Sequence, residues 1–318
     1  MVKIRRSGMW EGARRLLLGN QEKSGLLVRL LLYALLIVIG FIYLYPLLYM
    51  LATSFKSLSD LLNDSVKWIP TALYLDNYKQ ALEVMKFRET FIDTLLLSLI
   101  PAVLQVLVAS LTGYAFARYR FRGRLLLLGV LILTFVLPKQ ATMMPTYLLF
   151  KDMDIIGTLH AFTLPAGLGQ GINSAIITLI FYQFYRQLPD SIVEAAQLDG
   201  CGHWKVFVRI ALPTAGAAFL IGFLFSFVWY WNETYLTSLY VAGTGLGNKH
   251  SMSTLLLELR QFEASYKLLY PEGATSVNRI NESIRMAGTM ICIAPLLLVY
   301  FALQRYFVQS VDMVGLKD

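Results

Sequence analysis

The most specific chemical pattern of the chain lies in a polar interruption of an otherwise apolar sequence. Ser191 and Glu194 stand three residues apart just after Pro189, which is the spacing of a capping box, in which each residue hydrogen-bonds the other's backbone. Gly200, followed by Gly202, suits the left-handed residue that ends a helix. The pattern predicts a helix of about eight residues and about 12 Å, too short to be stable without a partner surface.

One face of this predicted helix carries small and apolar side chains with a carboxylate at its end. At helical spacing this face holds Ile192, Ala195, Ala196 and Asp199. Because small side chains let another protein approach closely, the chemistry expected here is protein docking rather than catalysis. The alternative is an ordinary amphipathic loop helix.

Residue types that usually perform catalysis are present but not grouped. His160, His203 and His250 are far apart in the sequence, which favours structural or solvated histidines. The glycine-rich segment 243–249 lacks the spacing of a nucleotide-binding loop, so we predict no phosphate cradle of that kind. No catalytic residue and no metal site is expected.

The elements that must position the docking segment are membrane spans. Hydrophobic residues make up 57% of the 318-residue chain and charged residues 15%, which is typical of a protein that crosses the membrane several times. Five charge-free runs can each cross about 30 Å of hydrocarbon as a helix. They are residues 30–55, 94–117, 155–185, 210–232 and 286–304. A sixth run from Leu125 is broken at Lys139, and we count it because the basic loops then share one side. The expected fold class is an all-α membrane protein with six transmembrane helices.

The distribution of charge predicts the orientation of these spans. With both termini in the cytoplasm, the cytoplasmic segments have a net charge of +9 and the outer segments −1, as the positive-inside rule requires. The overall charge of +8 is therefore a topology signal, and we expect no nucleic-acid binding. Attraction of the basic arm before Leu30 to anionic lipid headgroups is compatible with this orientation. The five charge-free spans contain no Asp or Glu, which argues against a proton-coupled or ion-coupled transporter.

The stretch from Glu194 to Pro213 resembles the signature of permease subunits of binding-protein-dependent ABC importers. That signature is Glu-Ala-Ala, three residues, Gly, nine residues and Ile-x-Leu-Pro, and every position is filled here. The resemblance implies a type I ABC importer permease fold in which the short helix docks into a cleft of the ATPase subunit at the cytoplasmic surface. The expected coupling residues are Ser191, Glu194, Ala195, Ala196, Asp199, Gly200, Ile210, Leu212 and Pro213.

Landmarks elsewhere are similar to the carbohydrate branch of that family, the MalG-like permeases of maltose-type transporters. They are residues 53–56, 75–78, 113–118, 137–138 and 231–233. The chain departs from the family pattern in three places. Asp93 replaces the usual Asn, the outer loop 234–285 is longer, and the tail at 314–317 matches only loosely.

The resemblance also implies the partners of the chain. These are a homologous second permease subunit, two ATPase subunits, an extracytoplasmic solute-binding protein and the lipid of a bacterial or archaeal cell (inner) membrane. ATP and Mg would be bound by the ATPase, so this chain is expected to need no cofactor and to be no enzyme. The implied function is import of a sugar, in particular an oligosaccharide, by coupling ATPase closure to alternating access. The alternatives are import of a non-sugar solute such as glycerol phosphate, or a membrane scaffold or sensor that moves no solute.

Lys139, Trp231 and Asn232 are the candidate residues of a solute path. Lys139 lies about 22 Å along the third span from Arg124. Its side chain either snorkels to the outer interface or lines an outer cavity that attracts an anionic solute. Trp231 and Asn232 close the fifth span.

The chain is expected to be organised as follows. A cytoplasmic basic arm covers 1–29, the first transmembrane helix 30–55, an outer loop 56–93, the permease core 94–305 and a cytoplasmic tail 306–318. Within the core, we expect the coupling loop at 186–213 and a second outer loop at 234–285.

Overall fold

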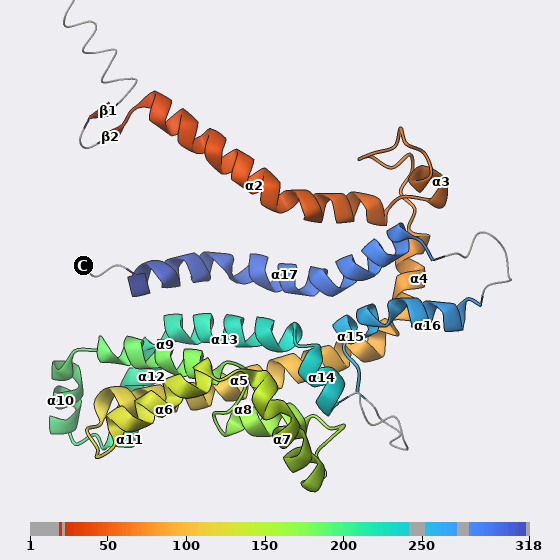
Figure 1. The fold of residues 1–318 in the computed structure, drawn as a ribbon. Helices are drawn as coiled ribbons and strands as arrows, with labels where there is room; N and C mark the ends of the chain where they lie inside the picture. The colour runs from red at the N-terminus through yellow and green to blue at the C-terminus, as the bar shows by residue number, and fades with distance from the viewer. Residues whose placement is uncertain (1–18, 21–22, 242–251, 272–279, 316–318) are drawn as a thin grey trace, which may run out of the picture. The chain divides into compact units, whose positions relative to one another are not determined.

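The computed structural model describes residues 19–20, 23–241, 252–271 and 280–315, and nearly all of them are helical (Figure 1). Expectations for most of the basic arm, for the segment 243–249 and for the last three residues lie outside the described part. The chain forms two compact units. One contains Met1–Tyr78 and Asn281–Met290, and the other contains Lys79–Ile280 and Ile291–Asp318.

In the first unit, the helix α2 (Leu26–Ser54) is the longest element. It follows the short antiparallel pair β1 (Gly19–Asn20) and β2 (Lys23–Ser24), and it precedes the one-turn helix α3 (Leu58–Leu61). Most large apolar side chains of α2 are exposed. A helix that is apolar on all sides requires apolar surroundings, so α2 is suited to a membrane.

Buried polar side chains fix the loop that follows α2. The Nζ atom of Lys56 donates to the carbonyls of Val66 at 3.0 Å and Lys67 at 2.8 Å. The Nδ2 atom of Asn77 donates to the carbonyls of Ser54 at 2.9 Å and Lys56 at 2.8 Å. Because buried polar groups are costly unless they are hydrogen-bonded, these contacts give the landmarks at 53–56 and 75–78 a structural role: they close the loop between α2 and residue 78.

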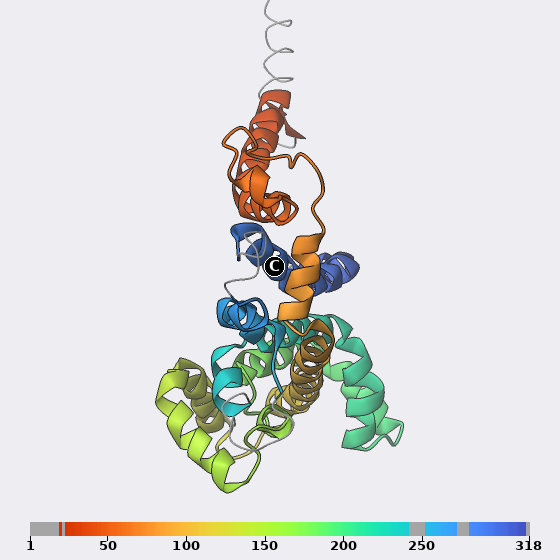
Figure 2. The same ribbon diagram turned by 90° about the vertical axis from the view of Figure 1, so that its right-hand side faces the viewer.

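The helix α5 (Phe87–Arg118) is central to the second unit and packs against the helices α8 (His160–Gly167), α9 (Ser174–Arg186) and α13 (Gly216–Trp231) (Figures 1 and 2). The two helices α5 and α9 approach closely at Gly113, where an added Cβ atom would lie 2.7 Å from the Cβ atom of Phe181. Ile177, Phe181 and Tyr185 of α9 are fully buried. A glycine is therefore required at 113 by close backbone packing.

Three helices among the described residues can each cross a membrane by length and composition. They are α2, α5 and the residues Glu282–Tyr306 of α17 (Glu282–Gly315). Two bent pairs bring the number to at most five. They are α6 (Arg124–Val136) with α7 (Lys139–Asp152), bent by 97°, and His203–Thr214 with α13, bent by 74°. The all-α membrane fold is thus confirmed.

The expected continuous span at 155–185 is instead divided into α8 and α9, each of which is shorter than the roughly 20 residues that a crossing requires. The division falls in the segment 167–171, where three of five residues are glycine and Gly169 has a φ of +76°. Glycine in this conformation ends a helix. The charge-free run at 155–185 is thus two helices joined at a break, and the runs at the two bends are broken as well.

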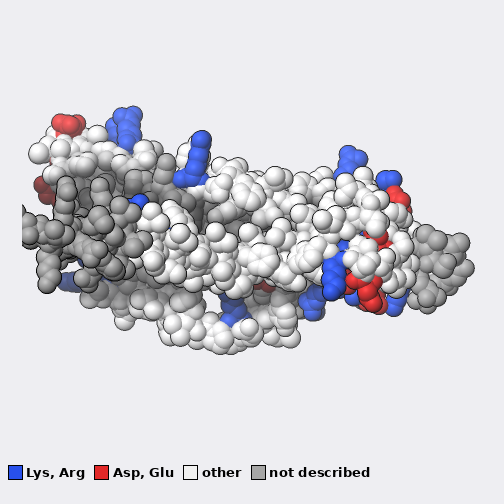
Figure 3. All heavy atoms as spheres, turned by 90° about the horizontal axis from the view of Figure 1, so that it is seen from above, with Lys and Arg blue, Asp and Glu red and all other residues white. Residues whose placement is uncertain are grey.

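The surface of the helices is mostly uncharged, as the space-filling view in Figure 3 shows for one face. Exposed large apolar side chains are numerous on α2, α5 and α6. A surface of this kind is typical of protein that lies in lipid.

The loop expected at 234–285 is attached to the start of α5. Its described helices are α14 (Tyr235–Tyr240), α15 (Leu255–Arg260) and α16 (Phe262–Leu269). The backbone N–H of Ser253 donates to Oδ2 of Asp93 at 3.1 Å, and that of Leu255 donates to Oγ1 of Thr94 at 2.9 Å. Asp93, a departure from the family pattern, thus accepts a hydrogen bond that positions this loop.

Candidate functional site: a docking helix and a membrane cavity

The predicted docking helix is present as α10 (Asp190–Leu198), a helix of 9 residues. Its N-cap is Pro189, with a ψ of 134°, and no side chain caps it. A capping box needs Ser191 at the extended N-cap position, but Pro189 occupies that position and Ser191 lies inside the first turn. The predicted capping box of Ser191 and Glu194 is therefore wrong. Both side chains are exposed and are free to meet another protein.

The predicted left-handed end of the helix is confirmed. Gly200 has a φ of +80°. Its N–H donates to the carbonyl of Gln197 at 3.0 Å, and the N–H of Cys201 donates to that of Ala196 at 3.0 Å. These two bonds form a Schellman motif, which satisfies the last carbonyls of α10.

The predicted docking face of α10 is only partly accessible. Ile192 is 43% exposed, and Ala195 and Asp199 are exposed. Ala196 is only 8% exposed, because its side of α10 faces other residues of the same chain. Ala196 is thus buried within the chain and its carbonyl accepts a bond of the Schellman motif, and its role in coupling stays a prediction.

Two large apolar side chains next to this face were missed by the sequence reasoning. Leu198, at the end of α10, is 88% exposed, and Trp204, in the one-turn helix α11 (His203–Val206), is 65% exposed. The signal in the sequence is that large apolar residues are unusual in a loop that is otherwise polar. Their exposure makes them candidates for contact with a partner protein.

The first residue of α10 contacts the end of α5 directly, and the other end is linked to it through His203. Arg118 donates from NH1 to Oδ1 of Asp190 at 2.5 Å and from NH2 to the carbonyl of Leu188. The Tyr119 ring lies 5.6 Å from the ring of His203, whose Nδ1 atom lies 3.4 Å from Nε2 of Gln197 at the other end of α10. The Asp190 side chain is 83% exposed, so solvent weakens this ion pair, and the bond from Arg118 to the Leu188 carbonyl adds a second contact. The helix α10 is therefore attached to α5.

The Ile-x-Leu-Pro part of the signature forms the bend between the docking loop and α13. A π-helix (Phe207–Ala211) runs into the short helix α12 (Leu212–Thr214), and α13 begins after Ala215. Ile210 and Leu212 are half-buried and Pro213 is exposed. Because proline has no N–H, it interrupts the helical ladder here, as a 74° bend requires.

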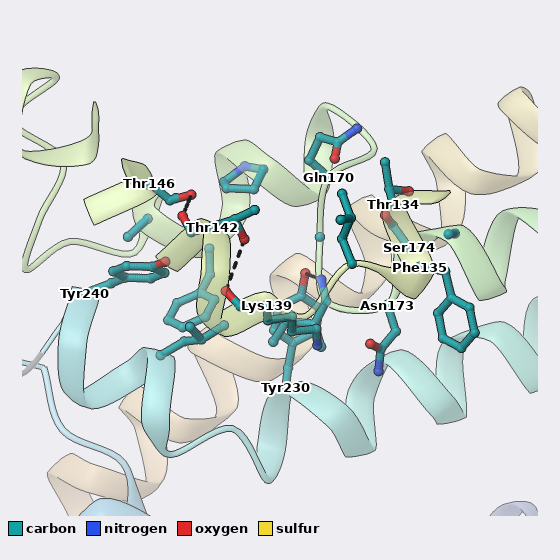
Figure 4. A pocket seen from close by; sticks show the side chains of 18 of the residues that line it. Thr134, Phe135, Lys139, Thr142, Thr146, Gln170, Asn173, Ser174, Tyr230 and Tyr240 are labelled. Carbon is teal, nitrogen blue, oxygen red and sulfur yellow. Dashed lines mark hydrogen bonds between the residues drawn. The ribbon is translucent and has the colours of Figure 1, made fainter. Parts of the chain in front are cut away.

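A cavity of about 210 Å³ lies where the break between α6 and α7 meets the break between α8 and α9 (Figure 4). Its lining combines aromatic side chains with hydroxyl, amide and amino groups. The polar lining residues are Thr134, Lys139, Thr142, Thr146, Gln170, Asn173, Ser174, Tyr230 and Tyr240. A concave site of this composition suits a small polar ligand.

A buried hydrogen-bond network holds one wall of this cavity. Tyr230 donates its hydroxyl proton to Oε1 of Gln105 at 2.8 Å and accepts from the N–H of Ile172 at 3.1 Å. The Nε2 atom of Gln105 donates to the carbonyl of Ile172 at 2.8 Å and to Oγ of Ser226 at 3.2 Å. An added Cβ atom at Gly171 would clash with Oε1 of Gln105. Gln105 and Tyr230 therefore position the break between α8 and α9, and sequence reasoning missed both.

Of the three predicted solute-path residues, only Lys139 lines the cavity. It is the first residue of α7, is exposed, and has no ion pair within the described part of the chain. Trp231 is 2% exposed and packs against the rings of Phe91 and Phe227. Asn232 is the C-cap of α13 and donates from Nδ2 to the carbonyl of Val228 at 2.9 Å.

The described features are those of a membrane permease with a polar loop that contains the short helix α10 and with a cavity lined by polar and aromatic side chains. A sequence model of the family described as "Binding-protein-dependent transport system inner membrane component" matches residues 105–313, which is more than half of the chain. The chain belongs to this family. It is the permease subunit of an ABC importer, as the signature had indicated.

Individual relatives agree with this assignment. The arabinooligosaccharides transport system permease protein AraQ of Halalkalibacterium halodurans is 28% identical and is aligned over 88% of this chain and 93% of its own. The osmoprotective compounds uptake permease protein GgtD of Synechocystis is 27% identical over 94% and 96%. A crystal structure of a bacterial ABC transporter involved in the import of the acidic polysaccharide alginate has a chain with a TM-score of 0.72 at 19% identity, covering 88% and 96%. This last likeness concerns the fold, and it supports the type I importer architecture.

Proposed function

We propose that the chain couples ATP-driven closure of a partner ATPase to the movement of an oligosaccharide through the membrane. The observation that carries this proposal is the attachment of α10 to α5. A force on α10 acts through Arg118 on α5, and α5 carries Gln105, which holds the wall of the cavity. Displacement of α10 would therefore reshape the cavity, which is what alternating access requires.

The partners follow from this role. Two ATPase subunits would bind ATP and Mg and carry out the hydrolysis, so this chain is not the enzyme of the assembly. A homologous second permease would complete the path, and an extracytoplasmic solute-binding protein would deliver the solute. Both termini would then lie in the cytoplasm. The coupling contacts would be made by exposed residues of the loop, which are Ser191, Ile192, Glu194, Ala195, Leu198, Asp199 and Trp204.

The hydroxyl and amide groups of the cavity support a sugar as the solute. Thr142, Thr146 and Asn173 can exchange hydrogen bonds with sugar hydroxyls, and the ring of Tyr230 or Tyr240 can pack on a sugar face. The oligosaccharide named for AraQ is in line with this proposal. A second candidate, an acidic solute such as an acidic saccharide or glycerol phosphate, is favoured by the amino group of Lys139 in the lining.

The direct test is reconstitution of the chain with the second permease, the ATPase and the binding protein in liposomes. Oligosaccharide bound to the binding protein should stimulate ATP hydrolysis and should accumulate inside. ATP hydrolysis that is indifferent to every saccharide, with no accumulation, would instead support the membrane scaffold or sensor.

Lys139→Gln tests the charge of the solute. If the solute is acidic, the variant should import an acidic oligosaccharide about tenfold more slowly at low concentration, because a hydrogen bond to a charged group contributes about 1.5–3 kcal/mol. Import of a neutral oligosaccharide should be unchanged. Lys151→Gln is the matched control, because Lys151 is an exposed residue of the last turn of α7 that does not line the cavity. Equal uptake of the acidic sugar by the parent and the Lys139 variant would eliminate the anion site.

The orientation can be tested by cysteine labelling in intact cells. With Cys201 replaced, a cysteine at the exposed position Ser191 should be protected from a membrane-impermeant maleimide, and one at the exposed position Ala264 in α16 should react. Permeabilised cells should label both, which controls for accessibility. The reverse pattern in intact cells would place the docking loop outside and remove the proposed ATPase contact.

A further inference from the structure

The loop between α5 and α6 is strongly basic. Together with the last residue of α5 and the first residue of α6, it places Arg118, Arg120, Arg122 and Arg124 within seven residues, and the segment 118–124 contains no Asp or Glu. Arg118 pairs with Asp190. Within the part of the chain that the structure describes, Arg120, Arg122 and Arg124 form no ion pair. Positive charge that is not neutralised by the protein attracts an anion from outside.

Two of these arginines line an open cavity of about 290 Å³. The remaining lining residues are Phe121, Gly123, Leu125 and Leu126. Leu125 is 82% exposed and Leu126 is 70% exposed, and they begin the apolar run of α6. The cavity therefore has two cationic side chains at the end of a membrane helix and an apolar wall that continues into the hydrocarbon region.

The position of Arg124 is fixed without a countercharge. Its guanidinium carbon lies 6.0 Å from the centre of the Tyr182 ring, and that of Arg186 lies 5.6 Å from the same ring. The NH2 atom of Arg124 lies 3.5 Å from the Tyr182 hydroxyl, and its Nε atom is buried without a hydrogen-bond partner. An aromatic ring orients arginines but leaves their charge available. Buried donors of this kind are usually satisfied by a ligand or water.

We propose that this cavity binds the headgroup phosphate of an anionic phospholipid from the leaflet on the side of the docking loop. Arg120 and Arg124 would hold the phosphate, and an acyl chain would run along Leu125 and Leu126. The combination of cations and exposed leucines favours a lipid over a soluble anion, because only a lipid has acyl chains that can contact the apolar wall. It also favours a lipid over an acidic protein, because the wall belongs to a membrane helix.

The bound lipid would stabilise the loop that attaches α10. Arg118, the last residue of α5, directly precedes this loop and contacts Asp190, the first residue of α10. Occupancy of the cavity would hold this loop against the helix ends. Solute-stimulated ATP hydrolysis by the complete transporter should then be higher in membranes that contain an anionic lipid than in membranes of zwitterionic lipid alone.

Native mass spectrometry of the full chain, released from neutral detergent after titration with phosphatidylglycerol, measures this binding directly. The parent should retain phosphatidylglycerol in preference to phosphatidylcholine. Arg120→Gln and Arg124→Gln should each weaken its binding about fivefold, since one basic residue contributes about 1 kcal/mol of attraction to anionic lipid. Arg122→Gln is the matched control, because it removes the same charge from the same loop but from outside the cavity lining.

Arg120→Gln is the decisive variant, because Arg120 makes no hydrogen bond or ion pair with the described residues and its loss should leave the thermal unfolding temperature in neutral detergent unchanged. Equal weakening by all three variants would show a diffuse electrostatic attraction and overturn the site. Displacement of the lipid by an equal concentration of inorganic phosphate would reduce the cavity to an anion site. Unchanged lipid retention together with loss of the co-purifying ATPase would assign the arginines to a protein contact and overturn the proposal as well.

Discussion

Gly200→Val should abolish solute-stimulated ATP hydrolysis while the membrane helices remain folded. Gly200 has a φ of +80° and open space around its missing side chain, so the effect arises from backbone conformation and not from a clash. A non-glycine residue in the left-handed region costs about 1–2 kcal/mol, and a β-branched residue is a stronger outlier. Since α10 has 9 residues and is marginal alone, loss of its Schellman motif should unravel its last turn.

The measurement is ATP hydrolysis and uptake by the reconstituted transporter, where we expect a decrease of at least about tenfold if the folded α10 loses more than about 1.4 kcal/mol of stability. Gly202→Val is the matched control. Gly202 has a φ of −67° and nothing within 4 Å of an added Cβ atom, so valine is tolerated there. Parent-like coupling in Gly200→Val would mean that the shape of α10 does not transmit closure. Equal loss in both variants would show instead that the loop tolerates no added side chain.

Gly113→Val should prevent stable assembly of the permease core. A Cβ atom at this position would lie 2.7 Å from the Cβ atom of Phe181, 2.8 Å from the backbone nitrogen of Tyr182 and 3.0 Å from the carbonyl oxygen of Thr178. Because two of these three atoms belong to the backbone, the helices α5 and α9 must move apart. Overpacking typically costs about 1–3 kcal/mol, and separation here also disturbs the fully buried Phe181 and Tyr185.

The yield of monodisperse protein and its thermal unfolding temperature in detergent measure this effect. Gly113→Ala should be an intermediate case, because it adds one methyl group. Gly129→Ala is the control, since Gly129 lies in α6 with nothing within 4 Å of an added Cβ atom. An unfolding temperature for Gly113→Val within a degree or two of the parent would contradict the close approach of α5 and α9.

Local features of the site could be predicted from the sequence because their causes are local. The docking helix and its end at Gly200 follow from a short segment that contains its own stop signal. The capping box failed because Ser and Glu at the right spacing do not determine which residue takes the extended position, and Pro189 takes it. The division of the span at 155–185 was missed because the span was assigned from the absence of charged residues. That criterion does not detect glycines that end a helix inside an apolar run.

Contacts between distant segments could not be predicted. Arg118 and Asp190 are 72 residues apart, and Gln105 and Tyr230 are 125 residues apart. Nothing in a single sequence pairs them. Lys139 was recognised as an unusual charge, but the structure was needed to bring it to the cavity with Asn173.

The network around Ile172 has a mechanical consequence. Both backbone polar groups of Ile172 are hydrogen-bonded to side chains of neighbouring helices: the N–H to Tyr230 and the carbonyl to Gln105. Breaking them without a replacement would leave buried polar groups unsatisfied, which costs about 1–3 kcal/mol each. The bonds therefore stabilise the break between α8 and α9 against straightening into one helix. Changes in the shape of the proposed solute path are then expected from helices that rotate as rigid units about other bends. The break between α8 and α9 is expected to move together with α5, to which Gln105 binds it.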